Sequence, residues 1–163
     1  MSTDTAEGRA TSAAAKGSFP TGVTIVTGIA DGVPFGTTVS AFTALGANHV
    51  AMWVLEDASI HDRLYASTVI GLSVLGADQK ALAGQFATHG IDRFAGIDWQ
   101  SGANGAPMLP DVLAAYELDV TERHSIGGFT LFYSTVTSAR GRDGHPLVWW
   151  RSEFWNGGGL TPR

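Results

Sequence analysis

The chain lacks cysteine entirely and has few charged residues for a protein of 163 residues. Without cysteine there is no disulfide, no thiolate nucleophile and no cysteine-based zinc or iron–sulfur site. The N-terminus shows no apolar core behind a basic start, so we expect no secretory signal. No apolar run approaches the roughly 20 residues that span a bilayer. We therefore expect a cytoplasmic protein without a membrane partner.

The net negative charge of the chain argues against nucleic-acid binding. Charged residues make up 15% of the chain, and the formal net charge is −5. The ten Lys and Arg residues are scattered, whereas nucleic-acid-binding domains usually present a basic patch. We expect no nucleic-acid partner. So low a charge content also favours burial of part of the surface against a second subunit.

Glycine and apolar residues dominate instead, with 21 glycines and 44% hydrophobic residues. A chain of this length forms one domain with a substantial core. We expect a disordered tail at 1–12, the domain at 13–155 and a flexible tail at 156–163.

Alternation of apolar and polar residues predicts strands along most of this domain. The first two, over about 21–30 and 33–42, are joined at Asp31-Gly32, a strong signal for a tight hairpin turn. Short connections favour antiparallel pairing, so we expect a partly open barrel with helical excursions. Further strands are predicted at 50–55, 69–75, 116–121, 129–138 and 147–151, a long loop at 96–111, and helices after Ser59 and over about 78–86.

Motifs of several enzyme classes are missing. There is no Gly-x-Gly-x-x-Gly after a strand and no P-loop. No two histidines have the close helical spacing of a zinc site, and we predict no metal. No residue stands out as a catalytic acid, base or nucleophile, so the catalytic residues stay unknown.

The segment Gly36-Thr-Thr-Val-Ser-Ala-Phe-Thr43 places small and hydroxyl-bearing residues around one aromatic. A strand built only for core packing would favour bulky branched residues. Small residues leave the backbone accessible, which suits a flat polar ligand lying along the strand. A half-buried barrel strand with outward polar residues shows the same pattern, so the residues alone leave both interpretations open.

The order of its motifs resembles that of the flavin reductase-like family, whose small FMN- or FAD-binding proteins supply reduced flavin to monooxygenases. Each piece is weakly specific alone, but the ordered set is specific, and it spans about residues 19–154. The resemblance implies a mainly β fold: a split β-barrel, antiparallel and Greek-key-like, with short inserted helices. The similar segments are 19–27, 36–43, 72–75, 79–87, 93–94, Trp99 and 105–109.

The resemblance implies a flavin ring lying against the second predicted strand. A serine at a helix N-terminus, Ser59, would then hold the flavin phosphate, although a plain N-cap is the commoner role of such a residue. Glu56, Asp57 and Asp62 oppose a phosphate there, and Arg93 would supply positive charge. The implied cofactor-binding residues are Thr38, Val39, Ser40, Ala41, Phe42, Ser59, Phe86, Ala87 and Arg93.

One motif of the family is altered. Its reductases usually carry Gly-Asp-His where the nicotinamide cofactor docks, and here Gly127-Gly128-Phe129 occupies that position. The implied nicotinamide or substrate side consists of His124, Gly127, Gly128 and Phe129. Hydride transfer belongs to the cofactors and needs alignment more than an acid or base, so the change permits reductase activity.

The function implied by the resemblance is that of an NAD(P)H-dependent flavin reductase. It would supply reduced FMN or FAD to a partner monooxygenase, with NADH or NADPH as co-substrate, and act as a homodimer. The altered 127–129 segment supports an alternative, a flavin-binding protein without reductase activity that carries flavin or acts on another substrate. A third possibility is a barrel of this class without flavin.

Aromatic residues near the C-terminus, among them Trp149, Trp150 and Trp155, are typical of a core or a dimer interface. Alternatively, they cover the flavin or hold an aromatic substrate.

Overall fold

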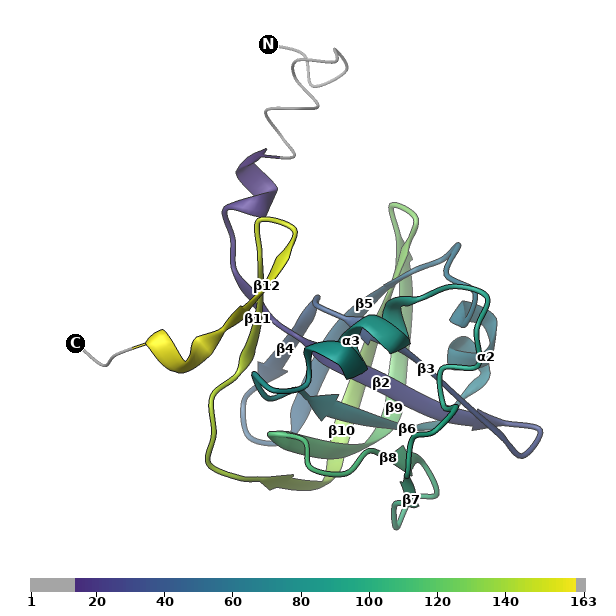
Figure 1. The fold of residues 1–163 in the computed structure, drawn as a ribbon. Coiled ribbons are helices and arrows are strands. Elements are labelled where there is room, and N and C mark those ends of the chain that lie inside the picture. Colours follow the sequence, from purple (N-terminus) through teal and green to yellow (C-terminus); the bar gives the residue numbers. More distant parts are fainter. Residues whose placement is uncertain (1–13, 161–163) are drawn as a thin grey trace.

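The structure, a computed structural model, describes residues 14–160, which form a mainly β fold (Figure 1). The expected tail at 1–12 lies outside the described residues. Residues 14–17 are helical, the further helices are α2 (His61–Ala66) and α3 (Lys80–Ala87), and η1 (Gly157–Gly159) is a 3-10 turn. The strands are β1 (Thr21–Gly22), β2 (Thr24–Ala30), β3 (Val33–Val39), β4 (Phe42–Leu45), β5 (His49–Leu55), β6 (Val69–Val74), β7 (Gln100–Ser101), β8 (Pro107–Met108), β9 (Ala114–Ile126), β10 (Phe129–Gly141), β11 (Leu147–Trp150) and β12 (Glu153–Asn156).

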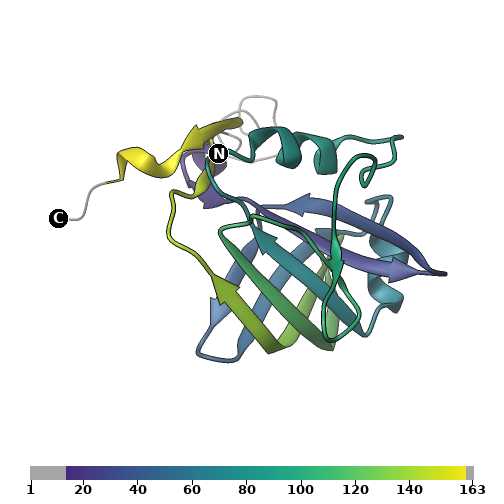
Figure 2. The same ribbon diagram turned by 60° about the horizontal axis from the view of Figure 1, so that its bottom comes forward.

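Seven strands form one antiparallel sheet in the order β3-β2-β6-β9-β10-β5-β4. The pairs β2–β6 and β5–β10 join strands that are distant in sequence, which gives a Greek-key-like connectivity. The two end strands, β3 and β4, follow each other in the chain, so the sheet curls to bring its ends together. The Trp53 N–H on β5 donates to the Ala41 carbonyl at 2.9 Å, which extends the β4–β5 pairing into the link from β3. Figure 2 shows the resulting partly open barrel, and the predicted fold class is confirmed.

Strands β5 and β6 are largely buried on both faces, which explains why they are mostly apolar. Consecutive residues of β2 point to opposite faces: Val26 joins the cluster inside the barrel, and Ile25 joins a second cluster outside it. The outer cluster also contains Phe86 of α3 and Leu147 of β11. Burial of this second cluster therefore fixes α3 and the C-terminal strands on the outside of the barrel.

The second predicted strand is in fact two strands. β3 ends at Val39, Ser40 and Ala41 belong to no strand, and β4 starts at Phe42 on the opposite edge of the sheet. The first hairpin forms where the sequence predicts it, with φ of 52° at Asp31 and 76° at Gly32. Positive φ at both central residues is what a type I′ turn requires. The predicted loop at 96–111 contains a small hairpin, β7–β8.

The strands β1, β11 and β12 form a separate sheet that stands away from the barrel (Figure 1). The sequence predicted one last strand over 147–151 and a flexible tail from 156. Instead β11 turns back through Arg151 and Ser152 into β12, and Gly157 is buried in η1. Both turn residues have positive φ, 51° and 62°, where Gly or Asn is usual, so the sequence carries no turn signal there. Within residues 14–160, no helix has the length and apolar character needed to cross a membrane.

Candidate functional site

A groove along β3 consists of two adjoining cavities. The wide cavity has a volume of about 510 Å³ and the narrow cavity about 190 Å³. The boundary between them falls between neighbouring residues on three segments: Gly36 and Thr37 on β3, Ala58 and Ser59 before α2, and His89 and Gly90 after α3. The two cavities are therefore two ends of one groove.

The wide cavity brings together six of the residues that the sequence predicts for a cofactor or its co-substrate. They come from the end of β3, the link to β4, the end of α3 and the start of β10, and they are Thr38, Val39, Ser40, Ala41, Ala87 and Phe129. Trp53 and His89 also line it, although no local motif marks either residue. This end of the groove combines a backbone wall with aromatic side chains.

The sequence pattern indicated that the hydroxyls of β3 face a ligand. In the structure, two of them bond to helix α3 instead. Thr38 donates to the Ala83 carbonyl at 2.7 Å, and Thr37 donates to the Phe86 carbonyl at 3.4 Å. These bonds hold α3 against β3. Ser40 and Ala41 are exposed and lie outside the strand ladder, so the backbone of this link, with the Ser40 side chain, is the polar surface that the wide cavity offers.

Phe129 forms the facing wall of the wide cavity. Its side chain is 40% exposed, and it pairs with Leu55 on β5 and with Ile126 on β9. The preceding Gly127-Gly128 is the β9–β10 turn, with φ of 59° and 81°, and the Gly128 carbonyl accepts a hydrogen bond from the Glu56 N–H at 3.0 Å. The two glycines thus place Phe129 without lining the cavity themselves.

Besides Gly127 and Gly128, three predicted residues lie outside both cavities. Phe42 packs against Tyr116, with ring centroids 6.0 Å apart, and Phe86 is fully buried against Phe94 at 5.1 Å. His124 is exposed and pairs with Glu122 at 2.8 Å. The side chains of Phe42 on β4 and Phe86 on α3 point toward the core. They therefore pack behind the residues that line the cavities.

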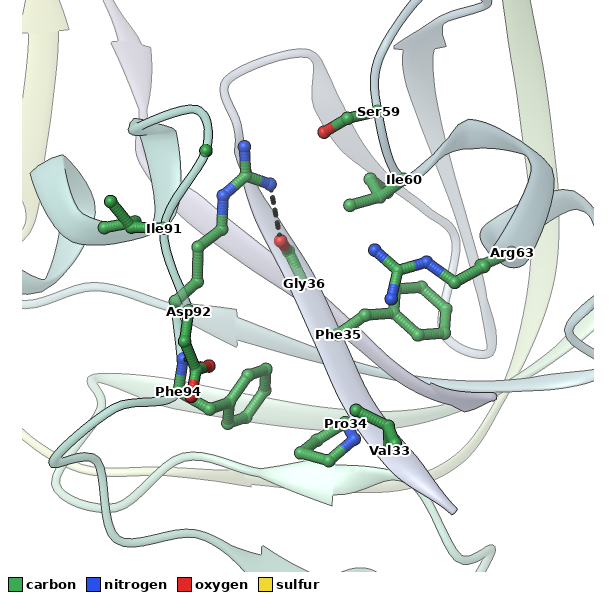
Figure 3. A pocket seen from close by; sticks show the side chains of 12 residues that line it. Val33, Pro34, Phe35, Gly36, Ser59, Ile60, Arg63, Ile91, Asp92 and Phe94 are labelled. Atoms are coloured by element: carbon green, nitrogen blue, oxygen red, sulfur yellow. Dashed lines mark hydrogen bonds between the residues drawn. The ribbon is translucent and has the colours of Figure 1, made fainter. Parts of the chain in front are cut away.

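The narrow cavity contains Ser59 and Arg93, together with Arg63, which sequence reasoning missed (Figure 3). Arg93 donates from Nη1 to the Gly36 carbonyl and from Nε to the Thr88 carbonyl, both at 2.8 Å. The Arg63 guanidinium lies 4.8 Å from the centre of the Phe35 ring, a cation–π contact. Arg63 lies on α2 and Ser59 precedes that helix, so no local spacing in the sequence signalled that they share a cavity.

The predicted N-cap role of Ser59 is wrong. Helix α2 starts at His61, its N-cap is Ile60, and no side chain caps it. The backbone at Ile60 is already near-helical, with φ of −101° and ψ of −5°, which moves the helix start one residue beyond Ser59. Ser59 instead lines the narrow cavity.

The narrow cavity is positively charged. Among the described residues the ion pairs are His61–Asp62 and His124–Glu122, so neither arginine of this cavity has a carboxylate partner there. Burial, and after it the charge of Arg63, lowers the pKa of Arg93. Of the three acidic residues expected to oppose a phosphate, none lines this cavity; Asp92 does, and its carboxylate accepts a hydrogen bond from the Phe94 N–H at 2.9 Å. An anion between the arginines would relieve their repulsion.

The wide cavity and the cationic narrow cavity thus form one groove on a curled antiparallel barrel. Residues 16–158 match the family described as Flavin reductase like domain. The chain belongs to the flavin reductase-like family, and its split-barrel fold is that of the family's solved structures.

Individual relatives agree with this assignment. The chain is 33% identical over 135 residues to FMN reductase (NADH) SmoA of Agrobacterium fabrum, covering 82% of the chain and 77% of the relative. It is 34% identical over 140 residues to the reductase component of 4-nitrophenol 4-monooxygenase/4-nitrocatechol 2-monooxygenase of Rhodococcus opacus, covering 85% and 75%. The structure of NADH:FAD oxidoreductase SgcE6 from Streptomyces globisporus, in complex with NAD and FAD fragments, has a TM-score of 0.85 and 31% identity over 91% of this chain and 92% of that one.

Proposed function

We propose that the chain is an NAD(P)H:flavin oxidoreductase that binds FMN or FAD in the groove along β3. The observation that carries this proposal is the continuity of the wide cavity with a cavity holding two arginines. A flavin has the matching shape, a planar ring system joined through a flexible chain to a phosphate. The family membership and the flavin and NADH named for the relatives support the same reaction.

In the wide cavity, the Ser40-Ala41 link would bind the polar edge of the flavin ring through backbone groups. Phe129, with Leu55 beside it, gives the facing wall an apolar surface. We assign this wall to the nicotinamide or substrate side. When bound there, flavin supplies the acceptor and the nicotinamide supplies the hydride, and the residues of the chain orient the two rings.

In the narrow cavity, Ser59, Arg63 and Arg93 would hold the phosphate. Two guanidinium groups offer several N–H donors, and hydrogen bonds between charged groups are roughly twice as strong as neutral ones. The lining hydroxyl of Ser59 adds a neutral donor. This arrangement applies equally to FMN and to the first phosphate of FAD.

A monooxygenase is the proposed recipient of the reduced flavin. The Rhodococcus opacus relative is named as the reductase component of such a system, and the exposure of Ser40, Ala41 and Leu55 leaves a path for flavin to leave the groove. We also propose that the protein is a homodimer. The expected cytoplasmic location stays a prediction.

The test is a titration with FMN and FAD, followed by anaerobic addition of NADH and NADPH while the visible flavin absorbance is recorded. We expect saturable binding of flavin and rapid bleaching, which would make the Asp and His of the usual Gly-Asp-His motif dispensable. Binding without bleaching by either donor would instead support a flavin carrier or an enzyme with another substrate. A protein that binds neither flavin would contradict both.

A further inference from the structure

His61 is a nearly buried histidine for which the proposed reaction has no use. Its side chain is 12% exposed and lines neither cavity. Its Nε2 lies 2.8 Å from the Thr130 hydroxyl, and Thr130 is fully buried on β10. Its Nδ1 lies 3.2 Å from the Asp62 carboxylate. The Thr130 hydroxyl also lies 3.5 Å from the Glu56 carboxylate, and the tautomer of His61 sets which partner donates in the His61–Thr130 bond.

This histidine stands at the start of a helix that needs outside support. Helix α2 has six residues and no side-chain cap, and helices so short are marginal on their own. Its position therefore depends on tertiary contacts. Ile60 and Leu64 supply the apolar ones, since both are buried in the barrel cluster. The polar ones include the His61–Thr130 bond at the start of the helix and the bond from Arg123 to the Ser67 carbonyl at its end.

The segment between β5 and α2 lines both cavities of the groove. Asp57 and Ala58 lie in the wide cavity, and Ser59 lies in the narrow one. Both ends of this segment are tied to the start of β10. The Glu56 N–H donates to the Gly128 carbonyl at 3.0 Å, and His61 bonds to Thr130. Hydrogen bonds to residues 128 and 130 thus fix both ends of this segment.

We propose that His61 is a positioning residue that sets the anion-binding end of the groove. By tying α2 to β10, it fixes Ser59 before the helix and Arg63 within it relative to Arg93, which comes from the far side of the groove. The inference rests on the proposed function, because it takes the anion to be the flavin phosphate. It adds a role for a residue that does not touch the ligand.

The test compares FMN with riboflavin, which has the same ring and ribityl chain but no phosphate. Dissociation constants are measured by flavin fluorescence for the wild type, His61→Leu, Thr130→Val and His61→Gln. We expect the riboflavin-to-FMN ratio of dissociation constants to fall about threefold to tenfold in His61→Leu and Thr130→Val, the range that one hydrogen bond supports. His61→Gln should recover most of the wild-type ratio, because its amide can bond to the Thr130 hydroxyl.

The matched control is Thr137→Val, which removes another threonine hydroxyl of β10, one that donates to the Glu117 carbonyl at 3.1 Å. The riboflavin-to-FMN ratio of dissociation constants for Thr137→Val should equal that of the wild type. A merely structural role for His61 would lower stability without changing the ratio, so folded His61→Leu or Thr130→Val protein with the wild-type ratio would overturn the inference. If His61→Leu fails to fold, Thr130→Val and His61→Gln decide the question.

Wild-type protein provides the reference that separates the two proposals. If it binds none of FMN, FAD and riboflavin, the proposed function fails and the inference falls with it. If it binds both with equal affinity, flavin binding stands, but the phosphate assignment and the role of His61 are overturned.

Discussion

Arg63 and Arg93 are the residues that give the groove its polarity. They come from α2 and from the loop after α3, and both line the narrow cavity. Their contributions differ, because Arg93 also donates to the carbonyls of Gly36 and Thr88 and so holds the structure together. Arg63 rests its guanidinium on the Phe35 ring, which makes it the cleaner position for a charge test.

Replacing Arg63 by glutamine should weaken FMN binding about tenfold or more, the usual effect of losing a hydrogen bond to a charged group. Riboflavin binding should change little, and the effect on FMN should shrink as salt is added. The substitution also removes the like charge that lowers the pKa of Arg93, so that pKa should rise toward its ordinary value.

Titration of both flavins at two salt concentrations measures the effect of Arg63→Gln. Arg140→Gln, at an exposed position near the end of β10, is the control and should bind FMN as the wild type does. An equal loss for FMN and riboflavin would show that Arg63 does not contact the phosphate.

At the scale of elements, the groove depends on how closely α3 approaches β3. Gly36 permits this approach, because a Cβ there would lie 2.7 Å from the Val26 carbonyl oxygen and 2.9 Å from the Phe86 ring. Two threonine hydroxyls of β3 then bond to carbonyls of α3. The helix end that carries Ala87 is held over the wide cavity by these contacts.

Gly36→Ala should therefore lower the free energy of unfolding by about 1–3 kcal/mol, the usual cost of overpacking, and should weaken flavin binding as α3 shifts. Gly84 on α3 is the matched control, since a Cβ there meets no atom within 4 Å. Gly84→Ala should raise the free energy of unfolding by about 0.5–1 kcal/mol through helix propensity. Chemical denaturation measures both, and a stable Gly36→Ala protein would refute the close-packing argument.

At the scale of the whole molecule, the sheet of β1, β11 and β12 presents two aromatic faces. Trp149 and Phe154 pack toward the outer core cluster. Trp150 and Trp155 pack edge to face, with ring centroids 5.4 Å apart and ring planes inclined by 61°, and Trp155 is 45% exposed. Exposed tryptophan is enriched at protein interfaces, and this face supports the proposed homodimer.

We expect light scattering coupled to size-exclusion chromatography to give the mass of a dimer. Trp155→Ser should raise the dimer dissociation constant about tenfold or more, as for a tryptophan at the centre of an interface. Ile29→Ser alters another partly exposed apolar residue, on β2, and should leave the dimer intact. A monomeric wild type would refute the homodimer, and a dimer unchanged by Trp155→Ser would place its interface elsewhere.

The sequence by itself determined the features that depend on neighbouring residues. Period-two alternation and the Asp31-Gly32 turn predicted the first hairpin and most barrel strands, because side-chain direction and turn conformation are local properties. The ordered motifs predicted the family, which the comparison confirms. The break at Ser40-Ala41 and the β11–β12 turn carried no such local signal.

Only the tertiary structure decided which polar groups face the groove. The threonine hydroxyls of β3 looked like ligand donors, yet α3 accepts their hydrogen bonds. No sequence motif marked Arg63, yet it lines the narrow cavity together with Arg93. Alternation specifies the face of a strand on which a side chain lies, but the partner it meets there depends on how distant segments pack. That packing established the cationic end of the groove. It also established the hydrogen bond between His61 and Thr130.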